Sequence, residues 1–534
     1  MSTETLVSHY LSYPDTHCFS PIAVDLHSAD EKLNPFVSRF FSLDNFADQI
    51  NEKKVRKVNR QVLHQVLTAQ YNEHDTSVAT RSNIDLLKEE NTFTITTGHQ
   101  LCLFTGPLYF IYKIIHTINL AARLKERFPE NNFVPVFWLA SEDHDFAEVS
   151  SVNVNGERIA WEPDTHQAPV GRLQLDHFDE VILQLKSALG DGPRANELLK
   201  LVEKCYRKEY HLSLATRLLT NELFGKYGLV ILDADDKRLK QQFAPIVQKD
   251  IREMISYSAV ARTSEELSRN YKLQVHPRAC NFFLFKANAR KRIDKTDNGF
   301  ELADTNISFT NEELLLHLET HPEDFSPNVI MRPLYQEFTL PNLAYIGGGG
   351  EQAYWLQLKG MFSDFDIPFP ILVLRNSALL IEEDQEKQLQ KIKVSIKQMF
   401  QPEEKLVKTL IREFEQDQFA NLSEENEKLK IVFLKLMADV GHRDVGLQRY
   451  VAAELRRQEN FFRSLETKLI RAGKIRHSAT LYQLNKLRNS LFPNGGLQER
   501  SANILTYLFR YPNIIDQLVS QLDPENKGFS VIRL

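Results

Sequence analysis

Four ionisable side chains stand in succession in the segment VFWLASEDHDFAEV at 136–149. Its apolar half predicts a buried strand, which is followed directly by Glu142, Asp143, His144 and Asp145. Carboxylates and an imidazole at a strand end favour general acid–base chemistry or the binding of an amine. Metal binding is the weaker interpretation, because no second cluster such as H-E-x-x-H accompanies the segment, and we expect no dedicated metal site. A charged loop that only caps the next element is the alternative without a chemical role.

A strand and a helix meet with almost no chain between them in FTITTGHQLCLFTGPLYFIYK at 93–113. In open α/β sheets, ligands bind beyond the carboxyl ends of the strands, and free N–H groups at a helix N-terminus favour an anion. Two alternatives without a role in binding stay open: Thr105 could serve merely as a helix cap, and Lys113 could be merely solvated. We expect the junction to bind an anionic group through Gly98, His99, Gln100, Thr105, Gly106 and Lys113.

A run of four glycines precedes an aromatic-rich segment that favours a helix. Such a loop lets the backbone approach a ligand closely. The run matches neither the P-loop pattern nor a G-x-G-x-x-G after the first strand, so no nicotinamide cofactor is indicated. Two arginines near strand-like segments are candidates for holding a carboxylate or a phosphate. The binding residues expected here are Gly347, Gly348, Gly350, Glu351, Arg332 and Arg375, with Gly171 and Arg172 of APVGRL as weaker candidates for lining a cleft.

Strands and helices must alternate around these segments from about 91 to 377. Short β-branched runs between amphipathic stretches predict a parallel sheet with helices on both faces. The piece SSVNVNGERIAWEP predicts an inserted hairpin with Asn-Gly as its turn. Strands are predicted in TFTITT, FVPVFWLA, GLVILDAD, ACNFFLFKA and FPILVLR, and helices at 107–127, 178–207, 210–226 and 237–257.

The flanking regions differ in composition from this α/β region. Residues 1–90 are predicted to be mostly helical, and 481–534 to form a turn and a last helix. Glycine and proline nearly vanish over 378–480, where Leu455, Phe462 and Leu469 repeat every seven residues. This repeat predicts an antiparallel coiled coil, with FANLSEEN as the link between its helices, and a homodimer. A helical hairpin packed on its own domain is the alternative.

The bulk properties exclude several classes of protein. A chain of 534 residues exceeds the size of one hydrophobic core, so two or three domains are expected. The net charge of −6 gives no support to a nucleic-acid surface, and no apolar run approaches the length of a membrane span. The N-terminus has no signal-peptide pattern, and the four cysteines are far apart, which favours free thiols in the cytoplasm. No G-x-S-x-G is present, so nothing indicates a serine nucleophile.

The motifs together resemble one family, the bacterial bacillithiol biosynthesis cysteine-adding enzymes. The resemblance is carried by TTGHQLCLFTGPLYFIYK, VPVFWLASEDHDFAEV, SPNVIMRPLYQE, LAYIGGGGEQAYWLQLK and LFPNGGLQER, and it spans nearly the whole chain. It implies a Rossmann-like core of the nucleotidyl-transferase type over 91–377, with insertions at about 150–225 and 258–325. It also implies a coiled coil used for dimerisation.

The resemblance further implies a reaction that joins the cysteine carboxyl to the amine of glucosaminyl malate. A carboxylate does not acylate an amine unaided, so ATP or ADP is the implied nucleotide. The HIGH and KMSKS signatures of the related synthetases are absent from this sequence. Two alternatives stay open: another carboxylate-activating ligase on the same fold, and a nucleotide-binding coiled-coil scaffold without catalysis.

Overall fold

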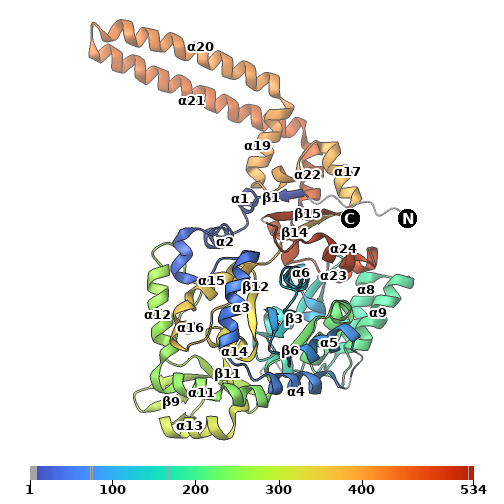
Figure 1. Cartoon of the computed structure of the whole chain (residues 1–534). Coiled ribbons are helices and arrows are strands. Elements are labelled where there is room, and N and C mark those ends of the chain that lie inside the picture. The colour runs from blue at the N-terminus through green and yellow to red at the C-terminus, as the bar shows by residue number, and fades with distance from the viewer. Residues whose placement is uncertain (1–8, 73, 75, 165–167, 527) are drawn as a thin grey trace.

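The computed structural model shows an α/β core from which a long helical arm projects (Figure 1). It describes residues 9–534 except 73, 75, 165–167 and 527. The N-terminal region is mostly helical, as predicted, and includes α2 (Pro21–His27), α3 (Phe46–Val55), α4 (Arg60–Tyr71) and α5 (Val78–Leu86). No helix in the described part of the chain is long and apolar enough to cross a membrane.

The centre of the core is a five-stranded parallel sheet in the order β13-β12-β2-β3-β6. The chain first builds the sheet outward from β2 in one direction and then returns to add the remaining strands on the other side. The order therefore reverses between β2 and β12, and such a switch point is where open α/β sheets bind ligands. The strands are β2 (Thr92–His99), β3 (Asn132–Leu139), β6 (Val230–Asp233), β12 (Asn342–Gly347) and β13 (Ile371–Leu374).

Both faces of this sheet are covered, which confirms the predicted fold class. Side chains alternate across a strand, and those of β3 enter two separate hydrophobic clusters. Val136 and Trp138 pack into one cluster, and Phe137 and Leu139 pack into the other. The helix α6 (Leu108–Arg127) belongs to the second cluster and packs on β2 and β3. Burial on both faces explains why FVPVFWLA, the segment of β3, is almost continuously apolar.

Two strand assignments needed correction. The segment ACNFFLFKA does form a strand, β7 (Phe282–Lys286), but its partners are antiparallel and lie outside the central sheet. In its place the central sheet contains β12, which the sequence did not indicate as a strand because it runs directly into the glycines. The second sheet has the order β10-β9-β8-β7-β11 and adds β8 (Ala289–Thr296), β9 (Gly299–Leu302), β10 (Ser308–Phe309) and β11 (Phe325–Pro327).

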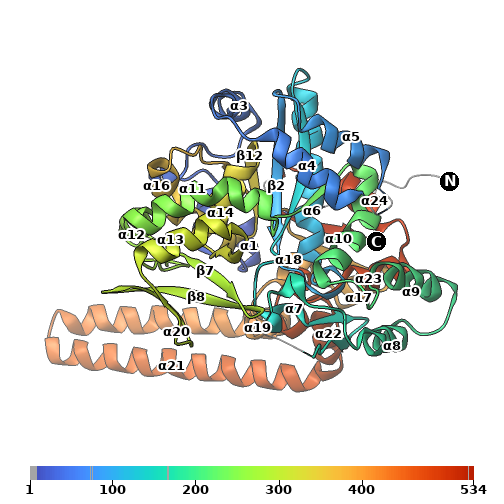
Figure 2. The ribbon, with the colours of Figure 1, turned by 90° about the horizontal axis from the view of Figure 1, so that it is seen from below.

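Two predicted helices are each broken in two. The first is interrupted by Gly190 and Gly192, both with positive φ, and the second by Met254 at φ 51°. The predicted hairpin is confirmed as β4 (Ser151–Val154) and β5 (Glu157–Ala160). Figure 2 places α8 and α9 on the opposite side of the core from β7 and β8. The helices are α8 (Phe178–Leu189), α9 (Pro193–Cys205), α10 (Leu212–Phe224), α11 (Lys237–Glu253) and α12 (Ile255–Leu267).

The arm is an antiparallel pair of helices, α20 (Gln416–Gly441) and α21 (Val445–Arg476) (Figure 1). The chain reverses at 442–444, so FANLSEEN lies inside α20 and is not the link between the helices. Leu455, Phe462 and Leu469 are only partly buried. Because α21 packs along α20 of the same chain, the heptad does not by itself define a contact with a second copy.

A third sheet joins the two ends of the chain at the base of the arm. The C-terminal strand β15 (Phe529–Arg533) lies between β1 (His9–Leu11) and β14 (Ala378–Ile381). It pairs antiparallel with β1 and parallel with β14. The region 481–534 is therefore not only helical, as predicted, but ends in a strand.

Candidate active site at the carboxyl edge of the central sheet

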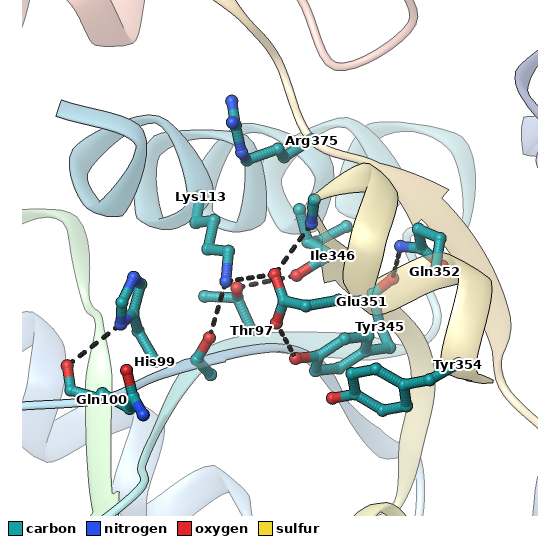
Figure 3. Close-up of polar contacts among 12 residues, drawn as sticks. Thr97, His99, Gln100, Lys113, Tyr345, Ile346, Glu351, Gln352, Tyr354 and Arg375 are labelled. Atoms are coloured by element: carbon teal, nitrogen blue, oxygen red, sulfur yellow. Dashed lines mark hydrogen bonds and ion pairs between the residues drawn. The ribbon is translucent and has the colours of Figure 1, made fainter. Parts of the chain in front are cut away.

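A buried ion pair occupies the switch point between β2 and β12 (Figure 3). Lys113 Nζ lies 2.5 Å from Glu351 Oε2 and donates to the Gly98 carbonyl at 3.0 Å. Lys113 is therefore neither solvated nor directed away from the junction. Gly98 is the penultimate residue of β2, and Glu351 lies in the first turn of α15 (Gly349–Gln357), so the pair connects two segments that were proposed separately from the sequence.

Glu351 is held as a carboxylate by three donors. Tyr345 OH donates to Oε1 at 2.7 Å, and the Gly348 N–H donates to Oε2 at 2.9 Å. Burial raises the pKa of this carboxyl, but Lys113 and the hydrogen bonds outweigh burial and lower the pKa to about 2. Burial lowers the pKa of the Lys113 ammonium, which the Glu351 carboxylate opposes. The result is a fixed charge pair with one quarter of the Glu351 side chain, 26%, open to solvent.

The N-terminus of α15 leaves space for a ligand. A Cβ added to Gly350 would meet no atom within 4 Å, and Gly350 itself is exposed. Gly347 instead packs closely, because a Cβ there would lie 3.0 Å from Gln352 and Tyr345. A Cβ on Gly349 would lie 3.0 Å from Ala23 Cβ, so within the run only Gly350 faces open space, where the N–H groups of the first helical turn favour an anion.

The two predicted arginines are both close to this end of the sheet. Arg332 donates to Tyr354 OH at 3.0 Å, and its guanidinium lies 5.9 Å from the centre of the Tyr345 ring. Arg375 follows β13 and donates to Glu499 at 2.7 Å. Its buried Nε has no partner among the described residues and lies 3.6 Å from the position of a Cβ on Gly348. One donor of Arg375 is thus left over beside the α15 N-terminus.

His99 and Gln100 connect the switch point to the charged segment after β3. His99 stacks on Tyr109, with ring centres 5.1 Å apart, and its Nδ1 lies 3.1 Å from the Gln100 carbonyl. Burial and the charge of Lys113 lower the pKa of His99 to about 3, so the imidazole is neutral at pH 7. The Gln100 side chain donates to Asp143 Oδ2 at 2.7 Å.

The chain that follows Thr105 and Gly106 packs against the C-terminal segment. Asn503 donates to the Gly106 carbonyl at 2.6 Å, and the Leu108 N–H at the start of α6 donates to the Ala502 carbonyl at 2.8 Å. Gly106 has φ +64°, and a Cβ there would lie 2.5 Å from Cys102 Cβ. The N-terminus of α6 is thus covered by the C-terminal segment, and α15 provides the open helix N-terminus in its place. Packing explains Gly106, whereas the buried Thr105 Oγ1 has no hydrogen-bond partner among the described residues. The predicted role of the two residues in binding an anion gains no support from the contacts of Gly106.

Glu142 belongs to a charged network on the β6 side of the site. Lys240 Nζ lies 2.7 Å from Glu142 and 2.8 Å from Asp235, and Arg172 donates to both Asp235 oxygens at 2.7 and 2.8 Å. Burial raises the pKa of Glu142, and the Lys240 ammonium opposes this rise. Glu142 is therefore an internal partner of a buried lysine and not a free loop carboxylate.

The other members of the charged segment have different surroundings. Asp143 accepts from Gln100 and from the His144 N–H at 2.7 Å, and its pKa is lowered because these donors and Arg290 outweigh burial. His144 Nδ1 lies 3.1 Å from Arg290 Nη1. Asp145 is exposed and precedes the short helix α7 (Phe146–Val149) without a side-chain cap bond. The structure thus brings three of the four residues into contact networks and leaves Asp145 at the surface.

A polar cavity of about 600 Å³ lies beside this network. It includes Gly171 and Arg172, as the sequence suggested, together with Ser141, Asp233 and Asp235 at the ends of β3 and β6. Ser141 donates a short hydrogen bond to Asp233. Gly171 must be a glycine here, because a Cβ would lie 2.4 Å from Ser141 Cβ.

Several residues of the site were not predicted from the sequence. Asp233 ends β6 and Asp235 follows it, both within GLVILDAD, and the rule applied to Glu142, that polar residues at strand ends meet at one edge, would have found them. Lys240 and Arg290 lie inside elements and are brought in only by the tertiary fold. Among the described residues, no group of three or more His, Cys, Asp or Glu side chains is arranged to hold a metal ion.

The fold and site define a class of protein: a Rossmann-like α/β domain with charged residues at its switch point and a C-terminal coiled-coil arm. The model of the N-terminal Rossmann-like domain of bacillithiol biosynthesis BshC matches residues 6–376, and that of its C-terminal coiled-coil domain matches 378–534. The chain belongs to the BshC family of bacillithiol biosynthesis.

Relatives with the same family name align with this chain over nearly its full length. A protein of Christiangramia forsetii named "putative cysteine ligase BshC" is 42% identical, with 98% of each chain covered. A protein of Flavobacterium johnsoniae with the same name is also 42% identical, over 98% of this chain and 99% of its own. A solved structure of a "putative arginyl t-RNA synthetase" from Campylobacter jejuni covers 87% of this chain at 11% identity and a TM-score of 0.21, a likeness too low to define the fold.

Proposed function

We propose that this chain is a cytoplasmic ligase that joins the cysteine carboxyl to the amine of glucosaminyl malate in the last step of bacillithiol biosynthesis. The family and the names of its relatives support this reaction. The observation that carries the proposal is a pair of adjoining sites at one sheet edge. An anion-binding helix end with Lys113 and Arg375 lies at the switch point, and a cavity lined by carboxylates lies beyond β3.

The switch-point half fits an activated carboxyl group or a nucleotide phosphate. The open N-terminus of α15 and the unpartnered Arg375 Nε are donors without acceptors in the described chain. Glu351 already neutralises Lys113, and Glu499 neutralises Arg375, so the net positive potential at this point comes from the helix end. ATP would supply the leaving group that makes amide formation favourable, and the resident donors would orient its phosphates.

The cavity half fits the amine substrate. Asp233 and Asp235 can accept from an ammonium group or from sugar hydroxyls, while Arg172 can donate to a carboxylate. The attacking nitrogen must lose a proton, and Glu142 at the edge of this network is a candidate acceptor because burial raises its pKa. When Glu142 accepts the proton, Lys240 keeps an anionic partner, because Asp235 lies 2.8 Å from its ammonium.

We also propose a homodimer formed through the arm. Large apolar side chains remain exposed on α20 and α21 although the two helices already pack on each other. A second copy would remove these side chains from water, at roughly 25 cal/mol for each Å² of apolar surface. They are Ile431, Val432, Leu434, Leu436, Val445, Leu447, Tyr450 and Phe461.

The dimer is tested by light scattering of the full chain and of the variant Leu434→Glu/Leu447→Glu. We expect twice the mass of one chain for the wild type and the mass of one chain for the variant. A monomeric wild type at micromolar concentration would contradict the proposal. Helical content measured by circular dichroism serves as the control, because both side chains are about half exposed and contribute little packing within one chain.

The reaction is tested by incubating the purified protein with cysteine, glucosaminyl malate and ATP and measuring the thiol product by mass spectrometry. Equal product without ATP would overturn nucleotide activation. Serine or alanine as an equally good substrate would favour another carboxylate-activating ligase on this fold. Nucleotide binding without any product, with or without cell extract, would overturn the ligase and leave the scaffold.

A further inference from the structure

Arg290 reaches the active-site edge from the inserted antiparallel sheet. It lies on β8, and its side chain is 7% exposed. Its Nη2 donates to the Pro327 carbonyl at 2.7 Å and its Nε donates to Ser326 Oγ at 3.0 Å. The guanidinium also covers the Phe283 ring, 4.0 Å from its centre. Three contacts inside the inserted sheet therefore fix the orientation of this side chain.

The remaining end of the guanidinium points at the charged segment after β3. Arg290 Nη1 lies 3.1 Å from His144 Nδ1 and 3.9 Å from Asp143 Oδ1. A guanidinium is always protonated in proteins and can only donate hydrogen bonds. His144 Nδ1 must then accept, and an imidazole whose Nδ1 accepts carries its single proton on Nε2.

The charges that face His144 come from two elements. Asp143 and Asp145 on its own segment favour the imidazolium, whereas burial and Arg290 from β8 disfavour it, and the balance lowers the pKa of His144. Phe283 of β7 lies against the ring, with centres 5.5 Å apart. The ring is 48% exposed, so it remains accessible to a ligand.

We propose that Arg290 is a positioning residue that holds His144 as the neutral Nε2–H tautomer, so that His144 donates a hydrogen bond to an oxygen of the reacting acyl group. His144 is then not the base that accepts the amine proton. The inserted sheet has a defined task in this arrangement, which is to deliver a permanent donor to the imidazole. This inference rests on the proposed function for the identity of the acyl group, but the tautomer itself does not depend on it.

The tautomer is measured by NMR of the full chain labelled with ¹⁵N-histidine, with the His144 signals assigned by comparison with His144→Gln. We expect about a tenfold or greater excess of the Nε2–H form at pH 7, since a hydrogen bond from a charged donor stabilises the accepting form. In Arg290→Met the excess should disappear and the protonation midpoint of His144 should move to higher pH. A wild-type His144 that is protonated at pH 7, or that is unchanged in Arg290→Met, would overturn the proposal.

Activity gives a second and independent measurement. Arg290→Met should lower turnover about tenfold or more, a smaller loss than removal of an oxyanion donor itself, because His144 is still present. Arg290→Lys keeps a charged donor and should restore part of the activity and of the Nε2–H signal. Arg292→Met is the matched control, because Arg292 lies on the same strand and pairs with Asp294 at 2.7 Å. Loss of activity in that control equal to that in Arg290→Met would overturn a specific role for Arg290.

The outcomes separate this inference from the proposed function. If cysteine and glucosaminyl malate are not joined, the proposed function fails, while the NMR result still decides whether Arg290 sets the tautomer. If the ligase is active but a pH–rate profile assigns the required basic group to His144, the inference fails and the ligase stands. If Arg290→Met does not fold, the Lys variant and the wild-type spectrum still decide the question.

Discussion

Breaking the Lys113–Glu351 pair tests the switch-point site most directly. The fall in the pKa of Glu351 from 4.5 to about 2, at 1.36 kcal/mol for each pKa unit, corresponds to about 3 kcal/mol of stability. The same size is expected from structure, because removing one partner of a buried pair leaves an uncompensated charge at a cost of roughly 3–5 kcal/mol. We therefore expect Glu351→Gln to lower the free energy of unfolding of the core by about 3 kcal/mol at pH 7.

The pH dependence gives the sign of this effect. The folded-state pKa of Glu351 is depressed, so the stabilisation is fully present above pH 4.5 and is lost as the pH falls toward about 2. The difference between wild type and Glu351→Gln should therefore be constant from pH 7 to pH 5 and shrink below pH 4.5.

Urea unfolding followed by tryptophan fluorescence is a suitable assay. All three tryptophans lie in the core, and Trp355 stacks on Tyr345, the hydroxyl donor to Glu351, with ring centres 4.4 Å apart. The double variant Lys113→Met/Glu351→Gln is the control, because it removes both charges and should be more stable than Glu351→Gln alone. A loss below about 1 kcal/mol, or one that does not change with pH, would refute the reasoning.

Three further predictions concern single residues. Gly106→Ala should lower the free energy of unfolding by about 1–3 kcal/mol, because the added Cβ would meet Cys102 and the residue has a positive φ. Gly350→Ala, in open space, should change it by less than about 0.5 kcal/mol, and thermal unfolding of both variants measures the difference. Glu142→Gln should reduce turnover about 10²-fold and also destabilise the core, because it leaves a buried lysine without one partner, whereas exposed Asp145→Asn should alter neither. Lys53→Met should lower the free energy of unfolding measured in urea by roughly 3–5 kcal/mol, because it leaves the fully buried Glu337, 2.8 Å from Lys53 Nζ, without its charged partner.

Each of these three has an outcome that contradicts it. Equal stability of Gly106→Ala and Gly350→Ala would show that the space around each glycine does not determine the effect of the substitution. A fully active Glu142→Gln would return the charged segment to a capping role. A Lys53→Met variant as stable as the wild type would show that the buried Lys53–Glu337 pair does not contribute to stability.

The sequence was most informative where burial on both faces made a strand continuously apolar. The segments FVPVFWLA and GLVILDAD were recognised as β3 and β6 for this reason. The strand NLAYIG was missed because its last residue begins the glycine run, which favoured a loop. The placement of ACNFFLFKA was wrong because a local pattern shows that a segment is extended but not which strands it pairs with.

The sequence placed candidate residues at one edge of the sheet but did not show which of them contact each other. Polar residues after β2 and β3 were identified from one rule, that ligands bind beyond the carboxyl ends of parallel strands. Those after β12 were identified from the glycine run. The rule could not distinguish the open helix end at Gly350 from the covered one at Pro107, because Asn503 and Ala502 cover the latter from almost 400 residues away. Nor could it find Arg290, whose segment ANARKRID resembles an ordinary charged surface strand.

The sheet at the base of the arm has a consequence for the order of folding. Its middle strand, β15, pairs with β1, and His9 lies opposite Val531, so this contact closes a loop that contains almost all of the described residues. Contacts of such large sequence separation form late, because closing a long loop costs conformational entropy. β15 is also the partner of β14, so the root of the arm is completed after the core has folded. Loss of the β1–β15 pairing would therefore leave a folded core whose arm is not anchored.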